Sequence, residues 1–248
     1  MIDLHAHVLP GVDDGPRTLE EAISILRSME ADGVTTVAAT PHVRDDYPTT
    51  VERMRSEVDA LRAATADAGL TVEVLPGGEI DLAQLGGLSS EERAGFGLGG
   101  NPQLLLLEFP YFGWPLGLRD AIFRLCSAGV VPLIAHPERN GEVQAAPEQV
   151  EELVRDGALV QVTAASVDGR LGPRSRRCAL RLVELGLAHV LASDAHAPTV
   201  RSAGLAAAAA ELGEIGSWMV SEVPKALLSG EALPPRPEQR RTLRSWRR

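Results

Sequence analysis

Short apolar runs alternate with longer amphipathic segments along most of the chain. Seven runs rich in aliphatic residues predict strands at 2–5, 34–40, 71–76, 104–108, 130–136, 159–163 and 189–193. Between them, apolar residues at helical spacing predict helices near 19–31, 50–68, 118–128, 147–156, 174–185 and 201–212. Strands that alternate with helices pair mostly in parallel, so the pattern predicts an α/β fold, either a closed barrel or an open doubly wound sheet.

Two segments interrupt this alternation. Residues 86–103 are rich in Gly and Ser, which predicts a surface loop or flap beside the binding site. Residues 229–248 are rich in Pro and Arg, which is typical of a solvated tail; a contact for an acidic partner or an anionic membrane surface is the alternative. We therefore expect one domain over 1–228 followed by a flexible tail.

The composition narrows the class of protein. The chain has 248 residues, 44% of them hydrophobic and 23% charged, which is enough apolar material for a sizeable core. A formal net charge of −10 disfavours binding to nucleic acid, whose phosphates would be repelled. No apolar run approaches the roughly 20 residues of a membrane span, and no signal peptide pattern is visible. With only two cysteines, the sequence predicts a cytoplasmic protein without a disulfide framework.

Histidines and carboxylates recur at the ends of the predicted strands. His5 and His7 close the first strand, where alternate residues face the same side and both imidazoles can reach one metal ion. Residues of the same kinds end or follow five further strands: His42, Glu79, Glu108, His136, Asp194 and His196. A single such residue is more often a cap or a solvated side chain. Their recurrence at the strand ends, where barrel active sites lie, predicts one metal-binding cleft.

The ligand types indicate the kind of metal. Imidazoles and carboxylates without thiolates suit Mn, Fe or Zn, and their number suits more than one ion. His189 opens the last strand, away from these ends, and is expected to be structural. Asp13-Asp14-Gly15-Pro16 alone is typical of a turn, but its nearness to His7 makes Asp14, more than Asp13, a candidate ligand.

Nucleophilic catalysis finds little support in the sequence. Neither Cys126 nor Cys178 begins a C-x5-R phosphate loop, and there is no G-x-S-x-G elbow or Walker-type loop. We therefore expect no covalent phosphoenzyme.

Seven short blocks carry a family resemblance. In order they read D-L-H-A-H, V-D-D-G-P, A-A-T-P-H-V, G-G-E, L-L-E-F-P, A-H-P-E-R and A-S-D-A-H, between Asp3 and about Arg201. Together they resemble the polymerase-and-histidinol-phosphatase (PHP) superfamily, and more closely its bacterial tyrosine-protein phosphatases of the CpsB/CapC type, which are associated with capsule and exopolysaccharide synthesis. The resemblance implies a distorted, TIM-like barrel of seven β/α units.

The resemblance also implies a site with three divalent ions, of which Mn is expected first and Fe or Zn are alternatives. One ion would be held by His5, His7 and Asp194. Glu79 would bridge this ion to a second, held also by Glu108 and His136. A third would be held by Asp14, His42 and His196. The phosphate-binding arginines of the family match Arg139 and Arg201.

The activity implied is metal-dependent hydrolysis of phosphotyrosine on a protein, with the tyrosine-rich tail of a bacterial tyrosine kinase as substrate. One alternative is a small-molecule phosphatase on the same scaffold, such as a histidinol-phosphate phosphatase. It would differ at the pocket rim, in 86–103 and 111–115. The other is a binding module that has kept the fold without catalysis. For Arg139, the alternative to phosphate binding is an ion pair with Glu138 or Glu142.

Overall fold

The structure, a computed structural model, describes residues 1–197 and 202–238. Arg201, one of the two predicted phosphate-binding arginines, lies outside the described residues. The strands are β1 (Ile2–Ala6), β2 (Thr36–Ala39), β3 (His42–Arg44), β4 (Tyr47–Pro48), β5 (Glu73–Pro76), β6 (Glu79–Asp81), β7 (Leu104–Glu108), β8 (Val131–Ala135), β9 (Leu159–Thr163) and β10 (Val190–Ala192).

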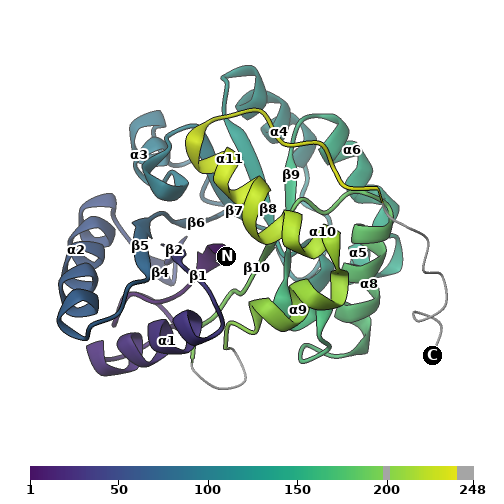
Figure 1. Cartoon of the computed structure of the whole chain (residues 1–248). Helices are drawn as coiled ribbons and strands as arrows, with labels where there is room; N and C mark the ends of the chain where they lie inside the picture. Colours follow the sequence, from purple (N-terminus) through teal and green to yellow (C-terminus); the bar gives the residue numbers. More distant parts are fainter. Residues whose placement is uncertain (198–201, 239–248) are drawn as a thin grey trace.

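Helices lie around the strands, as Figure 1 shows. The α-helices are α1 (Leu19–Ala31), α2 (Val51–Asp67), α3 (Ser90–Gly95), α4 (Leu118–Ser127), α5 (Gly141–Ala145), α6 (Val150–Arg155), α7 (Ala164–Val167), α8 (Pro173–Glu184), α9 (Leu205–Leu212), α10 (Glu214–Ser217) and α11 (Val223–Ser229). Shorter turns are η1 (Leu98–Gly100), η2 (Pro137–Arg139), η3 (Pro147–Gln149) and the π-type turn η4 (Trp218–Glu222).

The longest predicted helices are confirmed because their sequences carry both a buried stripe and a cap. In α1, Ile25, Leu26 and Met29 are buried, and the Thr18 side chain accepts a hydrogen bond from the Glu21 N–H. In α2, Thr50 caps the Arg53 N–H in the same way. Such caps satisfy backbone donors that the first helical turn leaves unpaired. The helix predicted near 201–212 begins only at Leu205.

Two of the predicted strands are each followed by a short strand that was not predicted. The second and third predicted strands, 34–40 and 71–76, correspond to β2 and β5, and after a break at Pro41 and at Gly77-Gly78 the chain continues as β3 and β6. Pro41 has no N–H for the sheet, but its carbonyl accepts a hydrogen bond from the Glu79 N–H at 3.0 Å. After the break, β3 begins at His42 and β6 begins at Glu79.

Parallel pairing closes the strands into a ring. One sheet has the order β1-β2-β5, and the other has the order β10-β9-β8-β7-β6-β3-β4. The two sheets are joined where the chain passes from β2 to β3 and from β5 to β6. The gap between β10 and β1 is bridged by hydrogen bonds of 2.8 Å from Asp194 N–H to the His5 carbonyl and from His7 N–H to the Ala195 carbonyl. The predicted seven-unit barrel is confirmed, and the open doubly wound alternative is wrong.

Residues 86–103 were predicted to be a surface loop or flap; most of 86–92 is exposed, but the segment is not an irregular loop. This segment contains α3, which has a capping box formed by Ser89 and Glu92, and it also contains η1. Phe96 and Leu98 are buried. A Cβ atom on Gly78 would lie 2.6 Å from the Phe96 side chain, so only glycine allows this close approach. Phe96 and Leu98 thus pack against the two glycines that precede Glu79.

The chain returns across the barrel after α9. In Figure 1, α11 crosses in front of the strands, and η4 and α11 both pack against β1. Beyond α11, the Arg236 guanidinium donates to the Ala188 carbonyl at 2.7 Å and the Val183 carbonyl at 2.9 Å, and lies 5.4 Å from the centre of the Trp218 ring. The division into a domain over 1–228 and a tail stays a prediction.

We expect Arg236→Ala to lower the free energy of unfolding by about 1 to 2 kcal/mol, because it removes two hydrogen bonds from a charged donor. Equilibrium denaturation in urea checks this value. Glu231→Ala, at an exposed position five residues before Arg236, is the control and should change stability little. Equal stability of the two variants would contradict an anchoring role for Arg236.

Candidate metal centre

The side chains predicted to bind metal converge at the end of the barrel where the parallel strands finish. All except Asp14 are buried. Their ligand atoms form four groups in which all atoms lie within 4.8 Å of one another: His5, His7 and Asp194; His5, Glu79 and His136; His42, Glu79 and Glu108; His7, Asp14, His42 and His196. The nine predicted ligands are therefore one connected cluster.

The first two imidazoles point the same way, as expected for alternate residues at the end of β1. The Nε2 atoms of His5 and His7 lie 3.2 Å apart. Behind them, His5 Nδ1 lies 3.0 Å from the Gln161 side-chain oxygen and His7 Nδ1 lies 2.6 Å from an Asp13 carboxylate oxygen. An acceptor at Nδ1 holds the proton there and leaves the Nε2 lone pair directed into the cluster, as metal-binding histidines require.

Glu79 occupies the centre of the cluster and is fully buried. Its Oε2 lies 2.9 Å from His42 Nδ1, 3.3 Å from His7 Nε2 and 3.4 Å from His5 Nε2. Its Oε1 lies 2.9 Å from His136 Nε2. A carboxylate whose two oxygens face different imidazoles has the geometry of a ligand shared between neighbouring ions.

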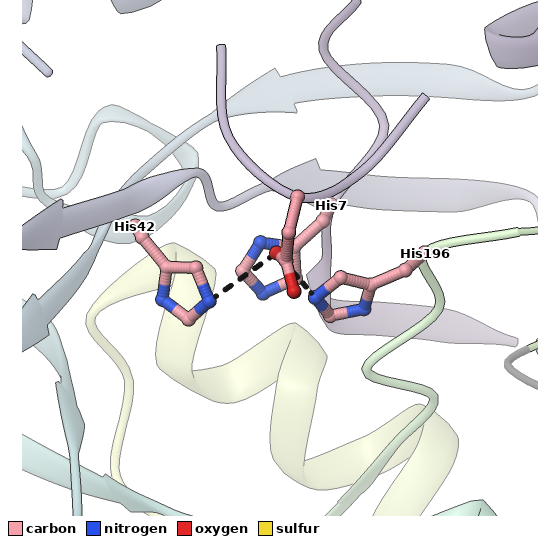
Figure 2. A group of neighbouring side chains, drawn as sticks. His7, His42 and His196 are labelled. Atoms are coloured by element: carbon pink, nitrogen blue, oxygen red, sulfur yellow. Dashed lines mark ion pairs between the residues drawn. The ribbon is translucent and has the colours of Figure 1, made fainter. Parts of the chain in front are cut away.

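A third group surrounds Asp14. Figure 2 shows the rings of His7, His42 and His196 close together. The Asp14 Oδ1 lies 3.1 Å from His196 Nε2 and 3.5 Å from His42 Nε2. The His7 and His196 rings stack at 3.8 Å. This group contains the three residues predicted to share one ion, with His7 in addition.

The second predicted group differs in its arrangement. Glu108 pairs with His42, with 3.4 Å between its Oε2 and His42 Nδ1. His136 is grouped with His5 and Glu79. The Arg44 Nη1 donates to both Glu108 oxygens at 3.0 and 3.3 Å, so Glu108 is held toward β3. In this structure Glu108 and His136 approach Glu79 from different sides.

The backbone is strained where two of these side chains begin. His136 and Asp194 are the residues other than glycine with positive φ among those described, at 35° and 52°. This left-handed conformation costs a residue with a Cβ on the order of 1 to 3 kcal/mol and is concentrated at functional sites. It turns both side chains from the strand direction into the cluster.

Arg139 extends over the same cluster from η2. Its Nη1 lies 2.6 Å from Asp194 Oδ2, and it donates a weak hydrogen bond to the Tyr111 hydroxyl at 3.4 Å. The alternative ion pair, with Glu138 or Glu142, is wrong: among the described residues the ion pair of Arg139 is with Asp194. The Glu138 carboxylate instead accepts hydrogen bonds from Thr163 N–H at 2.9 Å and from the Ser166 hydroxyl at 2.7 Å.

Charge pairing governs the protonation of the cluster. Burial disfavours a charged His42, but its ion pairs with Asp14, Glu108 and Glu79 outweigh burial and raise its pKa to about 12. Burial is likewise outweighed at Asp194, where Arg139 and the imidazoles hold the pKa well below its usual value. Without metal, protons on the imidazoles balance the carboxylate charge.

The donor set fits divalent cations. His42 Nδ1, Glu79 Oε2 and His136 Nδ1 are buried, and within the described part of the chain none has a hydrogen bond of good geometry. Buried polar atoms are normally satisfied, and His42 Nδ1 and Glu79 Oε2, which lie 2.9 Å apart, are therefore available to ligate a cation. Imidazole and carboxylate ligands without sulfur suit Mn, Fe or Zn.

Several residues that shape the site were not predicted. Asp13 and Gln161 orient the imidazoles, and Arg44 holds Glu108. Gln161 could have been found, because it is a polar residue inside the apolar strand β9. Arg44 is separated from its partner by 64 positions, and no local pattern connects the two.

The family model for capsular polysaccharide synthesis proteins, CpsB/CapC, matches residues 1–222. The tyrosine-protein phosphatase YwqE of Bacillus subtilis is 33% identical to this chain, and the match covers 98% of each protein. The tyrosine-protein phosphatase CpsB of Streptococcus agalactiae is 27% identical over 84% of the chain and 88% of its own length.

A solved structure described as YwqE from Bacillus subtilis and CpsB from Streptococcus pneumoniae, metal-dependent tyrosine phosphatases, superposes with a TM-score of 0.86 at 31% identity. It covers 97% of this chain and 100% of the other. A lactonase from Listeria monocytogenes, 13% identical with a TM-score of 0.51, shares the fold alone.

Metal affinity should rise with pH, because each imidazolium must lose its proton before it binds an ion. Because the raised pKa of His42, about 12, keeps it protonated throughout the range from about pH 6 to pH 7.5, we expect the apparent Kd for Mn²⁺ to fall across that range by about tenfold per pH unit for each proton displaced. Calorimetry in two buffers of different ionisation enthalpy measures both the affinity and the protons released. An affinity independent of pH would contradict the protonation described here.

Proposed function

The chain belongs to the CpsB/CapC family of capsular polysaccharide synthesis proteins, and from this membership we propose the function of its metal centre. The protein is a metal-dependent tyrosine-protein phosphatase. The observation that carries this conclusion is the buried cluster of imidazoles and carboxylates at the carboxyl ends of the strands, with the Arg139 guanidinium beside it. Its relatives of known structure are described as metal-dependent tyrosine phosphatases.

We propose that three divalent ions occupy the cluster, with Mn²⁺ as the first choice. The first ion would be held by His5, His7 and Asp194, and the third by Asp14, His42 and His196. The second would be held by Glu79, shared with the first, together with Glu108 and His136. Bound there, such ions supply Lewis acidity: they lower the pKa of a coordinated water and neutralise phosphoryl charge.

The protein's own groups complete the chemistry. Gln161 and Asp13 keep the imidazoles of His5 and His7 in one tautomer and orientation. Arg139 offers a planar guanidinium, which matches two phosphoryl oxygens and stabilises the charge that develops on them in the transition state. Tyrosinate is a good enough leaving group that no strong general acid is required.

A cysteine nucleophile does not fit the described structure. Cys178 is buried, and burial raises the pKa of its thiol to about 12, which disfavours the reactive thiolate. Cys126 lies on α4 and is absent from the groups of candidate ligands. Hydrolysis without a phosphoenzyme remains our proposal.

The substrate is a phosphotyrosyl protein, and we propose the tail of a bacterial tyrosine kinase as that protein. A histidinol-phosphate phosphatase would use the same metal cluster, but the named relatives with the highest identity reported above are tyrosine-protein phosphatases. No helix in the described residues has the length and apolar character needed to span a membrane. A cytoplasmic location remains a prediction.

Glu79→Gln should lower kcat by at least about a hundredfold and reduce bound metal, because it removes a charge that two ions share. Phosphotyrosyl-peptide kinetics and metal analysis on the same preparation measure both effects. Glu73→Gln, an exposed position on β5, is the matched control and should retain activity. Full turnover with an unchanged metal content would remove Glu79 from the bridging position.

Arg139→Ala should reduce kcat/KM for a phosphotyrosyl peptide by about 2 to 4 kcal/mol, while metal content and melting temperature stay near normal. Inorganic phosphate should also inhibit this variant less well. Arg119→Ala, which removes an exposed guanidinium paired with Asp156, is the control. If the variant unfolds or loses metal, Arg139 serves the structure through Asp194 instead of the substrate.

A further inference from the structure

Aromatic side chains are concentrated beside the metal cluster. The chain has only four Phe, two Tyr and three Trp residues, and four of these nine fall within 109–114, directly after Glu108. Phe109 is buried and meets Trp114 edge to face at 5.6 Å. Tyr111 and Phe112 are exposed, with Phe112 at 88% of its full accessible area. Two exposed aromatic side chains beside a catalytic cluster indicate a binding surface.

A pocket of about 260 Å³ opens at this surface. It is lined by Arg44, Asp81, Glu108, Pro110, Tyr111 and Phe112. A cavity of about 150 Å³ is enough for benzene, so a phenol ring fits. Glu108 belongs both to this pocket and to the metal cluster. A ring in the pocket therefore has its substituent at the edge of the cluster.

The wall of the pocket is fixed relative to Arg139. The Asn140 side-chain amide donates to the Pro110 carbonyl at 2.7 Å and the Gly113 carbonyl at 2.8 Å. The Gly141 N–H donates to the Tyr111 carbonyl at 3.1 Å. The loop that carries Arg139 thus holds the backbone on both sides of Phe112.

Tyr111 joins the two sites through its side chain. Its ring is parallel to that of His136, with 6.0 Å between their centres, and its hydroxyl accepts a hydrogen bond from Arg139. Arg44, on the pocket lining, is held by Glu108 and Asp46, so its guanidinium plane is restrained. Aromatic rings and guanidinium planes both stack favourably on an aryl group.

We propose that Tyr111, Phe112 and Arg44 form the subsite that receives the phenol ring of the phosphotyrosyl side chain, an inference that rests on the proposed function. The subsite selects aryl over alkyl phosphomonoesters, because the short side chain of phosphoserine has no ring to fill it. Phe112 is a specificity residue that touches the substrate away from the reacting atoms.

The test compares two non-hydrolysable ligands, phenylphosphonate and methylphosphonate, by calorimetry on the full chain loaded with Mn²⁺. The wild type should bind phenylphosphonate about tenfold more tightly, the amount expected for stacking a ring on aromatic side chains. Phe112→Ala should bring the two affinities within about twofold and leave the methylphosphonate affinity unchanged. Phe112→Trp should restore the preference.

The matched control is Phe123→Ala. Phe123 lies on α4, is 65% exposed and does not line the pocket, so this variant should keep the full preference for phenylphosphonate. The inference is overturned if Phe112→Ala keeps the preference, or if it weakens the binding of phosphotyrosyl peptides but not of phenylphosphonate. Failure of the proposed function would instead appear as a wild type that hydrolyses no phosphotyrosyl peptide, whatever its affinity for the phosphonates.

Discussion

The buried carboxylate of Glu79 is the constraint on which the rest of the structure depends. A single ion taken from water into a protein interior costs several kcal/mol unless opposite charge surrounds it. Glu79 meets this demand with nitrogen atoms of His5, His7, His42 and His136, all within 3.4 Å. These imidazoles come from the ends of three strands, β1, β3 and β8, so the charge of Glu79 is balanced only when these strand ends have come together.

The barrel closes at the metal-binding cluster itself. The hydrogen bonds that join the first and last strands involve the backbone of His5, His7 and Asp194, so the residues that complete the ring also carry ligand side chains. Asp194 and His136 adopt left-handed backbone conformations there. The surrounding barrel must supply the free energy that keeps them strained. In return, their side chains and the Arg139 guanidinium face one point, where a phosphoryl group can meet metal ions and a fixed positive charge together.

Residues around the cluster fix the orientation of the predicted ligands. Asp13 and Gln161 select one tautomer for two imidazoles, and Arg44 restrains Glu108 from the outer side. The loop that follows Glu108 is tied to the Arg139 loop by Asn140. In the function that we propose, the strand ends would hold the ions, and the two loops after β7 and β8 would set the distance between the phosphate and the ring of the substrate.

The sequence by itself determined the alternation of strands and helices, the caps of the long helices, and the recurrence of histidines and carboxylates at strand ends. These features are local, because periodicity of two or 3.6 residues and capping act over a few positions. Tertiary structure alone decided that 86–103 packs against the glycines before Glu79, that Glu108 pairs with His42, and that Arg139 pairs with Asp194. The physical reason is that these distances depend on strand register, on the breaks at Pro41 and Gly77-Gly78, and on closure of the ring. Such relations connect positions far apart in the chain, and no local pattern encodes them.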